Sequence, residues 1–160
     1  MNKGFTLIEI IIVIMIMTLV LGVSAVTYQG TTQEKRLDSD IQKIPDIVRK
    51  ARDKTVNREI PPGITCTVFN GYSVFFDQPN SRVALRLRCD GVVRQEIRTT
   101  FAYSRIESLP APPELFFDYP LARPNRVFNV TLENRTNNRC KEVVIDLNGN
   151  VEDIEDSFVC

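Results

Sequence analysis

The sequence predicts an α+β fold, with one long N-terminal stem helix packed on a C-terminal antiparallel β-sheet. Three observations predict this class: an apolar run over residues 5–28, apolar residues at helical spacing over residues 29–58, and short β-branched and aromatic runs between turn residues over residues 59–160. With 160 residues, the chain has room for one domain with a modest core.

The apolar run over residues 5–28 predicts the transmembrane first half of the stem helix. Its only charged residue is Glu9. As a helix it extends about 36 Å, enough for the hydrocarbon core of about 30 Å. An isolated strand in lipid would leave its backbone groups unsatisfied, so a helix is predicted despite the many β-branched residues. Lys3 and the amino terminus precede the run, which places the start in the cytoplasm and the body across the membrane.

Two alternatives compete for this segment. A cleaved secretory signal peptide could end at Gly22-Val23-Ser24-Ala25, but the apolar run is long and only one base precedes it. A plain single-pass membrane anchor explains every feature of this segment except Glu9. A carboxylate so near the start of a span costs about 1–3 kcal/mol unless it is paired, so Glu9 predicts a function and a partner.

The residues around Glu9 form a specific motif. The chain reads Gly4-Phe5-Thr6-Leu7-Ile8-Glu9 after a short leader, residues 1–4, that contains one base. This hexapeptide, followed by about 20 apolar residues, resembles the type III signal of type IV pilins and type II secretion pseudopilins. The resemblance covers roughly the first 30 residues of the chain.

The resemblance implies a processing pathway. An inner-membrane prepilin peptidase would cut between Gly4 and Phe5 and N-methylate the new amine of Phe5. A glycine at Gly4 admits the peptidase closely because it has no side chain. In this family the residue at the position of Glu9 offsets the terminal amine of a neighbouring subunit during assembly. Glu9 lies one helical turn after Phe5 on the same face, and the neighbour's amine supplies the partner that its carboxylate needs.

Residues 29–58 predict the amphipathic outer half of the stem helix. Apolar residues recur at steps of three to five positions, apart from the adjacent pair Ile47 and Val48, namely at Leu37, Ile41, Ile44, Ile47, Val48, Ala51 and Val56. Charged residues between them, Asp40 and Lys43 included, are expected on a solvated face. Pro45 predicts a kink between Gln42 and Pro45, and Gly30-Thr31-Thr32 is a second weak point. The segment resembles a pilin stem; a stalk leading to another periplasmic domain is the alternative.

Residues 59–160 predict an extracytoplasmic, β-rich head. The expected strands cover residues 64–68, 72–76, 82–88, 92–100, 126–133, 142–147 and 151–154. Hairpin turns are expected at Asn70-Gly71, Pro79-Asn80-Ser81, Asp90-Gly91 and Asn148-Gly149. Five of the nine prolines fall between residues 108 and 124, which predicts a loop or crossover there.

Four cysteines lie in the predicted head, and an even number in an oxidising compartment indicates two disulfides. Three pairings exist, and we favour Cys66–Cys89 across the first hairpins and Cys140–Cys160 at the C-terminus. The second pair resembles the C-terminal disulfide loop of many pilins. A structural zinc is the rival, but the chain has no CxxC pair and no His.

Two charge clusters suggest binding sites. The first is a basic stripe of candidate nucleic-acid contacts, Arg82, Arg86, Arg88, Arg94 and Arg98, with Arg105 beyond it. We favour a solvated face whose charges meet acids on neighbouring subunits. The second is the acidic segment of residues 142–160, where residues 146–152 faintly resemble a calcium loop. A hairpin turn at Asn148-Gly149 is the simpler interpretation, and no metal site is predicted.

Composition limits the function further. Twenty Lys and Arg balance 20 Asp and Glu, so no global attraction to nucleic acid is expected. The absence of His excludes Ser–His and Cys–His catalysis and His-ligated zinc or haem. No phosphate loop or nucleophile motif is present, so an enzyme on a membrane anchor has no supporting residues, and no cofactor is expected.

The sequence therefore predicts a structural subunit, a minor pilin or pseudopilin, of a type IV pilus-like or type II secretion filament. The resemblance implies four partners: prepilin peptidase, other subunits, the inner-membrane assembly platform and membrane lipid. Residues 51–56 and 143–149 also resemble H-type minor pseudopilins. The alternative is a membrane-tethered module that binds DNA or a protein through the basic stripe.

Overall fold

The computed structural model describes residues 7–153 and 157–160, without the side chains of residues 21–30 and 153. The predicted leader, the cleavage site between Gly4 and Phe5, and the methylated amine of Phe5 therefore lie outside the described residues. The chain divides into two units, residues 1–35 and residues 36–160. We describe each unit by itself and call the second one the body.

Two helices open the chain, α1 from Leu7–Ile41 and α2 from Lys43–Val56. The interruption at Gln42 falls where Pro45 predicts a kink, because Pro45 has no N–H to donate to the carbonyl of Ile41. Helix α1 continues through residues 30–32, where the sequence predicted a second weak point. In the body, the end of α1 and the buried face of α2 carry Leu37, Ile41, Ile44, Val48 and Ala51.

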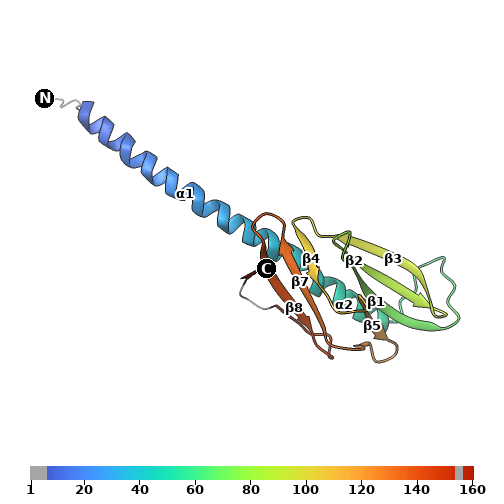
Figure 1. The fold of residues 1–160 in the computed structure, drawn as a ribbon. Helices are drawn as coiled ribbons and strands as arrows, with labels where there is room; N and C mark the ends of the chain where they lie inside the picture. The colour runs from blue at the N-terminus through green and yellow to red at the C-terminus, as the bar shows by residue number, and fades with distance from the viewer. Residues whose placement is uncertain (1–6, 154–156) are drawn as a thin grey trace. The chain divides into compact units, whose positions relative to one another are not determined.

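The strands form two antiparallel sheets (Figure 1). Sheet A has the order β3-β2-β1-β5-β6 and consists of β1 (Phe69–Asp77), β2 (Arg82–Cys89), β3 (Val92–Thr100), β5 (Glu114–Asp118) and β6 (Arg123–Pro124). Sheet B has the order β10-β8-β7-β4, with β9 also on β8, and consists of β4 (Ser104–Ser108), β7 (Phe128–Asn134), β8 (Arg139–Ile145), β9 (Val151–Asp153) and β10 (Phe158–Val159). The α+β class is confirmed, with two sheets in place of the one that the sequence predicted.

One core joins the helices to both sheets. Alternation along β2 directs Val83, Leu85 and Leu87 inward, and all three are buried. The rings of Phe76 in sheet A and Phe128 in sheet B stack with their centroids 5.1 Å apart. All five of these side chains belong to the cluster that also contains the buried face of α2.

Several strand predictions are confirmed and others are wrong. The strand over residues 92–100 has the predicted bounds, and turns occur at Pro79-Asn80-Ser81, Asp90-Gly91 and Asn148-Gly149. Residues 64–68 form no strand, and the proline-rich segment contains β5 and β6. The sequence also missed β4 and β10.

The predicted turn at Asn70-Gly71 lies inside β1 instead. Gly71 has a φ of 121°, and a Cβ there would lie 2.2 Å from the carbonyl oxygen of Phe117 on β5. Gly71 is therefore required for the close approach of β1 and β5, beside a register shift in the β1–β2 ladder, and not for a reversal of the chain.

Candidate functional site

The described start of α1 exposes an apolar surface. Its twelve large apolar side chains between Leu7 and Val20 are 50–78% exposed. Glu9 lies in the first described turn of this helix and is also exposed. Burying one such apolar side chain contributes about 1.5–3 kcal/mol, so this surface is stabilised when another apolar surface covers it.

Among the residues that the structure describes, we find no helix that is both long enough and apolar enough to cross a membrane.

Within the body, a buried carboxylate near the end of α1 binds the segment that leads from β3 into β4. Asp40 is fully buried and accepts hydrogen bonds from the backbone N–H groups of Ala102 (3.2 Å), Tyr103 (2.7 Å) and Ser104 (2.9 Å). The ammonium group of Lys43 donates a fourth bond at 2.6 Å. Burial alone would raise the pKa of Asp40, but the bonds from Lys43, Tyr103 and Ala102 lower it below its usual value. The sequence prediction that Asp40 lies on a solvated face is wrong.

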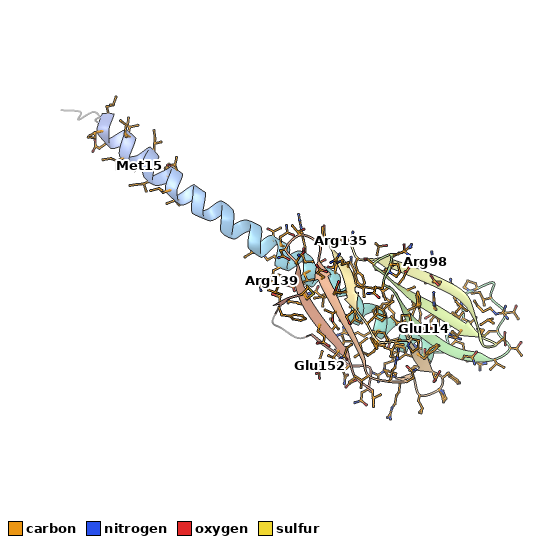
Figure 2. The ribbon with its side chains drawn as sticks, in the orientation of Figure 1. Met15, Arg98, Glu114, Arg135, Arg139 and Glu152 are labelled. Atoms are coloured by element: carbon orange, nitrogen blue, oxygen red, sulfur yellow. A yellow bond between two sulfur atoms is a disulfide. The ribbon has the colours of Figure 1, made fainter. Side chains whose placement is uncertain are left out.

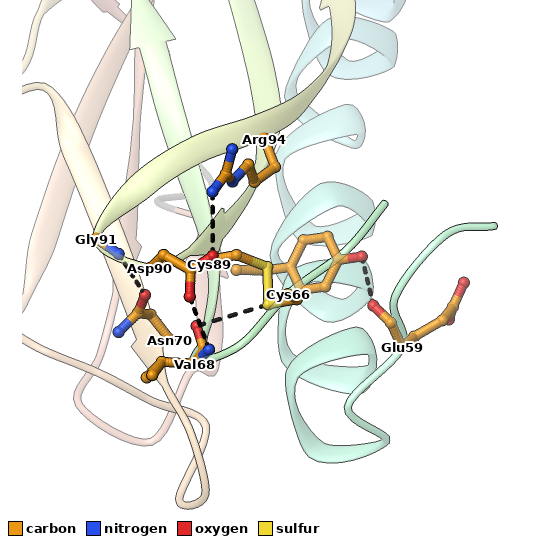
Figure 3. The surroundings of a disulfide bond; sticks show 9 residues. Glu59, Cys66, Val68, Asn70, Cys89, Asp90, Gly91 and Arg94 are labelled. Carbon is orange, nitrogen blue, oxygen red and sulfur yellow. Dashed lines mark hydrogen bonds and ion pairs between the residues drawn. A yellow bond between two sulfur atoms is a disulfide. The ribbon is translucent and has the colours of Figure 1, made fainter. Parts of the chain in front are cut away.

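The first disulfide connects the segment between α2 and β1 with the end of β2 (Figure 3). Cys66 is bonded to Cys89, with their Cα atoms 5.4 Å apart. Beside it, the carboxylate of Asp90 accepts a hydrogen bond from the backbone N–H of Val68 at 2.8 Å and pairs with Arg94 at 3.1 Å. The hydrogen bond from Val68 lowers the pKa of Asp90. Residues 64–68 form no strand, and these contacts fix their position instead.

The second disulfide, Cys140–Cys160, connects β8 to the C-terminus. Two residue pairs, Phe158 with Cys140 and Val159 with Arg139, form the short β10–β8 ladder beside it. Both disulfides join the pairs that the sequence favoured.

The basic stripe lies on the outer face of sheet A, where acids of the same chain oppose it. Figure 2 shows Arg98 on the edge strand and Glu114 three strands across. The ion pairs on this face are Arg82–Asp77 (3.6 Å), Arg86–Glu96 (2.7 Å), Arg86–Glu114 (3.8 Å), Arg88–Glu114 (3.4 Å), Arg94–Asp90 (3.1 Å) and Arg98–Glu96. Arg105 pairs separately with Glu133 on β7 at 2.5 Å. The hydrogen bond from Arg98 lowers the pKa of Glu96.

Aromatic rings also hold two arginines of the stripe. The guanidinium of Arg86 lies 3.5 Å from the ring centroid of Phe75, and that of Arg88 lies 4.6 Å from the centroid of Phe116. Arg94 falls at a register shift between β2 and β3, so the even spacing that suggested one uniform stripe is interrupted.

The loop of residues 146–150 is a hairpin turn between β8 and β9. The carboxylate of Asp146 accepts backbone N–H bonds from Asn148 and Asn150, each at 2.8 Å, and a side-chain bond from Asn150 at 3.0 Å. Burial raises the pKa of Asp146, and the bonds from Asn150 and Asn148 lower it to below its usual value. The hairpin interpretation is confirmed. Within the described part of the chain, no three acidic or cysteine side chains are arranged to hold a metal ion.

Comparison with known proteins identifies the first segment of the chain. Residues 1–25 match the family model described as the prokaryotic N-terminal methylation motif. No curated protein and no solved structure matches the chain. The chain therefore carries a prepilin-type signal, and the motif match covers the start of α1 that exposes Glu9 and the apolar surface.

Proposed function

We propose that this protein is a structural subunit, a minor pilin or pseudopilin, of a type IV pilus-like or type II secretion filament. The observation that carries the proposal is the match of residues 1–25 to the N-terminal methylation motif. Prepilin peptidase removes residues 1–4 and methylates Phe5, so the protein is a substrate of an enzyme and not an enzyme itself.

The mechanism is assembly through the N-terminal helix. The apolar side chains from Leu7 to Val20, all at least half exposed, support this role because lipid covers them before assembly and other subunits cover them afterwards. The carboxylate of Glu9 then pairs with the methylated amine of Phe5 on a neighbouring subunit. Pairing lowers the cost of an acid in an apolar helix bundle.

The proposed location is the bacterial inner membrane, with a cytoplasmic N-terminus, and later a periplasmic or surface filament. Two disulfides within the body support an oxidising compartment for residues 36–160. The similarity of residues 51–56 and 143–149 to H-type minor pseudopilins supports that subtype.

The experiment that tests the proposal is intact-mass analysis and N-terminal sequencing of the protein purified from membranes of its own cells. We expect a chain that begins at methylated Phe5, and a Gly4→Arg variant that keeps residues 1–4. A wild-type chain that keeps residues 1–4 in cells with active peptidase contradicts the proposal. A start near Val26 also contradicts it, since that indicates a cleaved signal peptide.

Nucleic-acid binding through the basic stripe is the second candidate. Two arginines stacked on aromatic rings, Arg86 and Arg88, favour it, while the four acids Asp77, Asp90, Glu96 and Glu114 oppose it. We expect no salt-sensitive mobility shift of DNA by the full chain in uncharged detergent. A shift that charge reversal at Arg86 and Arg88 removes would favour this candidate.

A further inference from the structure

Strand β3 is a long, uncovered edge of sheet A. It has nine residues, whereas the other edge strands of the described sheets, β6, β4, β9 and β10, have two to five. In the part of the chain that the structure describes, β3 pairs only with β2 (Figure 1). Alternate residues of an edge strand direct their N–H and C=O groups away from the sheet, where they can pair with another strand.

The inner face of β3 lacks the usual protection of an edge. Charged residues that discourage pairing, Arg94, Glu96 and Arg98, lie at the register shift or on the outer face. The inner face carries uncharged residues, and its Ile97 is 51% exposed. Val92 and Val93 at the start of the strand are 48% and 42% exposed. An added strand would therefore meet apolar side chains as well as free backbone groups.

A groove of about 370 Å³ separates this inner face from α2. Its apolar floor consists of Ile47, Leu85 and Ile97. Because neighbouring strands lie about 4.8 Å apart, side chains of a strand added to β3 would project over this groove.

Three lysines of α2 line the groove, Lys43, Lys50 and Lys54, against one acid, Asp46. Lys43 also pairs with Asp40, and Lys54 with Glu59. Lys50 is exposed and forms no ion pair with a described residue. The groove is thus complementary to carboxylates, with Lys50 as the cation most available to a partner.

The length of the groove indicates the length of the partner. Lys43, at one end, donates a hydrogen bond to the carbonyl oxygen of Thr100 at 3.1 Å. A helix rises about 16 Å from Lys43 to Lys54, which is the length of about five residues of extended strand.

We infer that the edge of β3 and this groove bind an extended acidic segment of a partner protein, which adds to sheet A as a further antiparallel or parallel strand. Main-chain hydrogen bonds to β3 supply affinity, an apolar side chain packs against Ile97, and flanking carboxylates pair with the lysines of α2. The interaction involves the body and is independent of the processing of Phe5.

The test uses the full chain in uncharged detergent micelles and a fluorescent, end-blocked hexapeptide of sequence Glu-Glu-Val-Val-Glu-Glu. Each face of this peptide as a strand presents one Val between two Glu side chains, so either orientation fits the groove. We expect saturable binding by fluorescence polarisation and slower hydrogen exchange of residues 92–100. Lys50→Glu should weaken binding about tenfold, whereas Arg52→Glu, an equal charge change at an exposed position outside the groove, should leave it within about twofold.

Two further peptides separate strand addition from charge attraction alone. N-methylation of all backbone amides of the peptide should abolish binding because it removes the main-chain donors of both strand edges, and Lys in place of each Glu should weaken binding strongly. The proposal is overturned by no saturable binding at millimolar peptide, by equal binding of the N-methylated peptide, or by equal losses in the Lys50 and Arg52 variants. Self-association of the chain that Lys50→Glu removes, without peptide binding, would assign the edge to a second copy instead.

Discussion

At the scale of single residues, we expect loss of the Asp40 carboxylate to lower the free energy of unfolding most. Asp40→Ala leaves three backbone N–H groups without their acceptor and removes the carboxylate that pairs with Lys43, so we expect the free energy of unfolding to fall by about 3 kcal/mol. Asp53→Ala, at an exposed position on α2, should change it by less than about 0.5 kcal/mol. Urea unfolding of the full chain in micelles, followed by tyrosine fluorescence, measures both. Equal effects would show that the buried carboxylate has no special role.

The lowered pKa of Asp40 predicts a dependence of stability on acid. A carboxyl whose pKa is lower in the folded state contributes stability that is present above the unfolded pKa of about 4 and is lost as the pH falls through the folded value. Asp90, Glu96 and Asp146 have lowered pKa values as well and add to this loss. We therefore compare wild type with Asp40→Asn at pH 6 and pH 3. Their difference in unfolding free energy should shrink at pH 3, and a constant difference would contradict the assignment.

Substitution of Gly71 should have a steric effect on stability that can be separated from the effect of backbone strain. Gly71→Ala places a Cβ against the carbonyl of Phe117 at a positive φ, so we expect a loss of more than about 2 kcal/mol in unfolding free energy. Gly91 also has a positive φ, of 77°, but a Cβ added there would have no other atom within 4 Å, so Gly91→Ala should cost only about 1 kcal/mol. Similar losses in the two variants, measured by urea unfolding, would rule out the close approach of β1 and β5 as the cause.

At the scale of elements, local signals predicted the structure where they were sufficient. The β-branched run of β3 and the Asp90-Gly91 turn before it predicted the strand, and Pro45 predicted the interruption near Gln42. Asn70-Gly71 has the chemistry of a turn, yet the approach of Phe117 from β5 determines its conformation. The five residues of β5 were missed because prolines on both sides of them dominate the local pattern.

The candidate sites also differ in whether their residues are adjacent in the sequence or come together only in the fold. The signal around Glu9 is contiguous, so a short motif reveals it. Asp40 was assigned to a solvated face because its partners, Ala102 to Ser104, are 62–64 residues away in the chain. The acids Asp77 and Glu114 reach the basic stripe only through the pairing of β1 with β2 and β5.

The C-terminal strand β10 is an element that depends on its disulfide. Only two residue pairs join β10 to β8, whereas the bond between Cys140 and Cys160 closes a loop with a sequence separation of 20. Cys140→Ser with Cys160→Ser should lower the free energy of unfolding by about 3 kcal/mol and speed hydrogen exchange in residues 157–160. Mass spectrometry of exchange, with β1 and β2 as internal reference, checks this. Unchanged exchange at the C-terminus would show that the ladder holds β10 without the disulfide.

At the scale of the whole molecule, the chain combines a body with its own buried core and an N-terminal helix whose apolar side chains remain exposed. The body needs no neighbour to cover its core, whereas the helix surface does. The proposed filament would cover the exposed helix surface, because its subunits would pack their apolar helices against one another. Assembly, rather than folding of the body, should therefore be the step that is sensitive to changes at Glu9.

Glu9→Ala is the variant that separates assembly from folding of the body. It should leave processing at Phe5, membrane association and the stability of the body unchanged, because the alanine removes only the carboxylate for which we propose pairing with a neighbouring amine. We expect at least a tenfold lower amount of the subunit in sheared filaments, relative to the amount in membranes, about what loss of one desolvated charge pair costs. Glu34→Ala removes the same charge from an exposed position further along α1 and should assemble normally. Glu9→Gln keeps the shape of the side chain without its charge, so it should fail as Glu9→Ala does if charge is the requirement. Filaments that contain Glu9→Ala at the wild-type level would show that apolar contacts alone drive assembly.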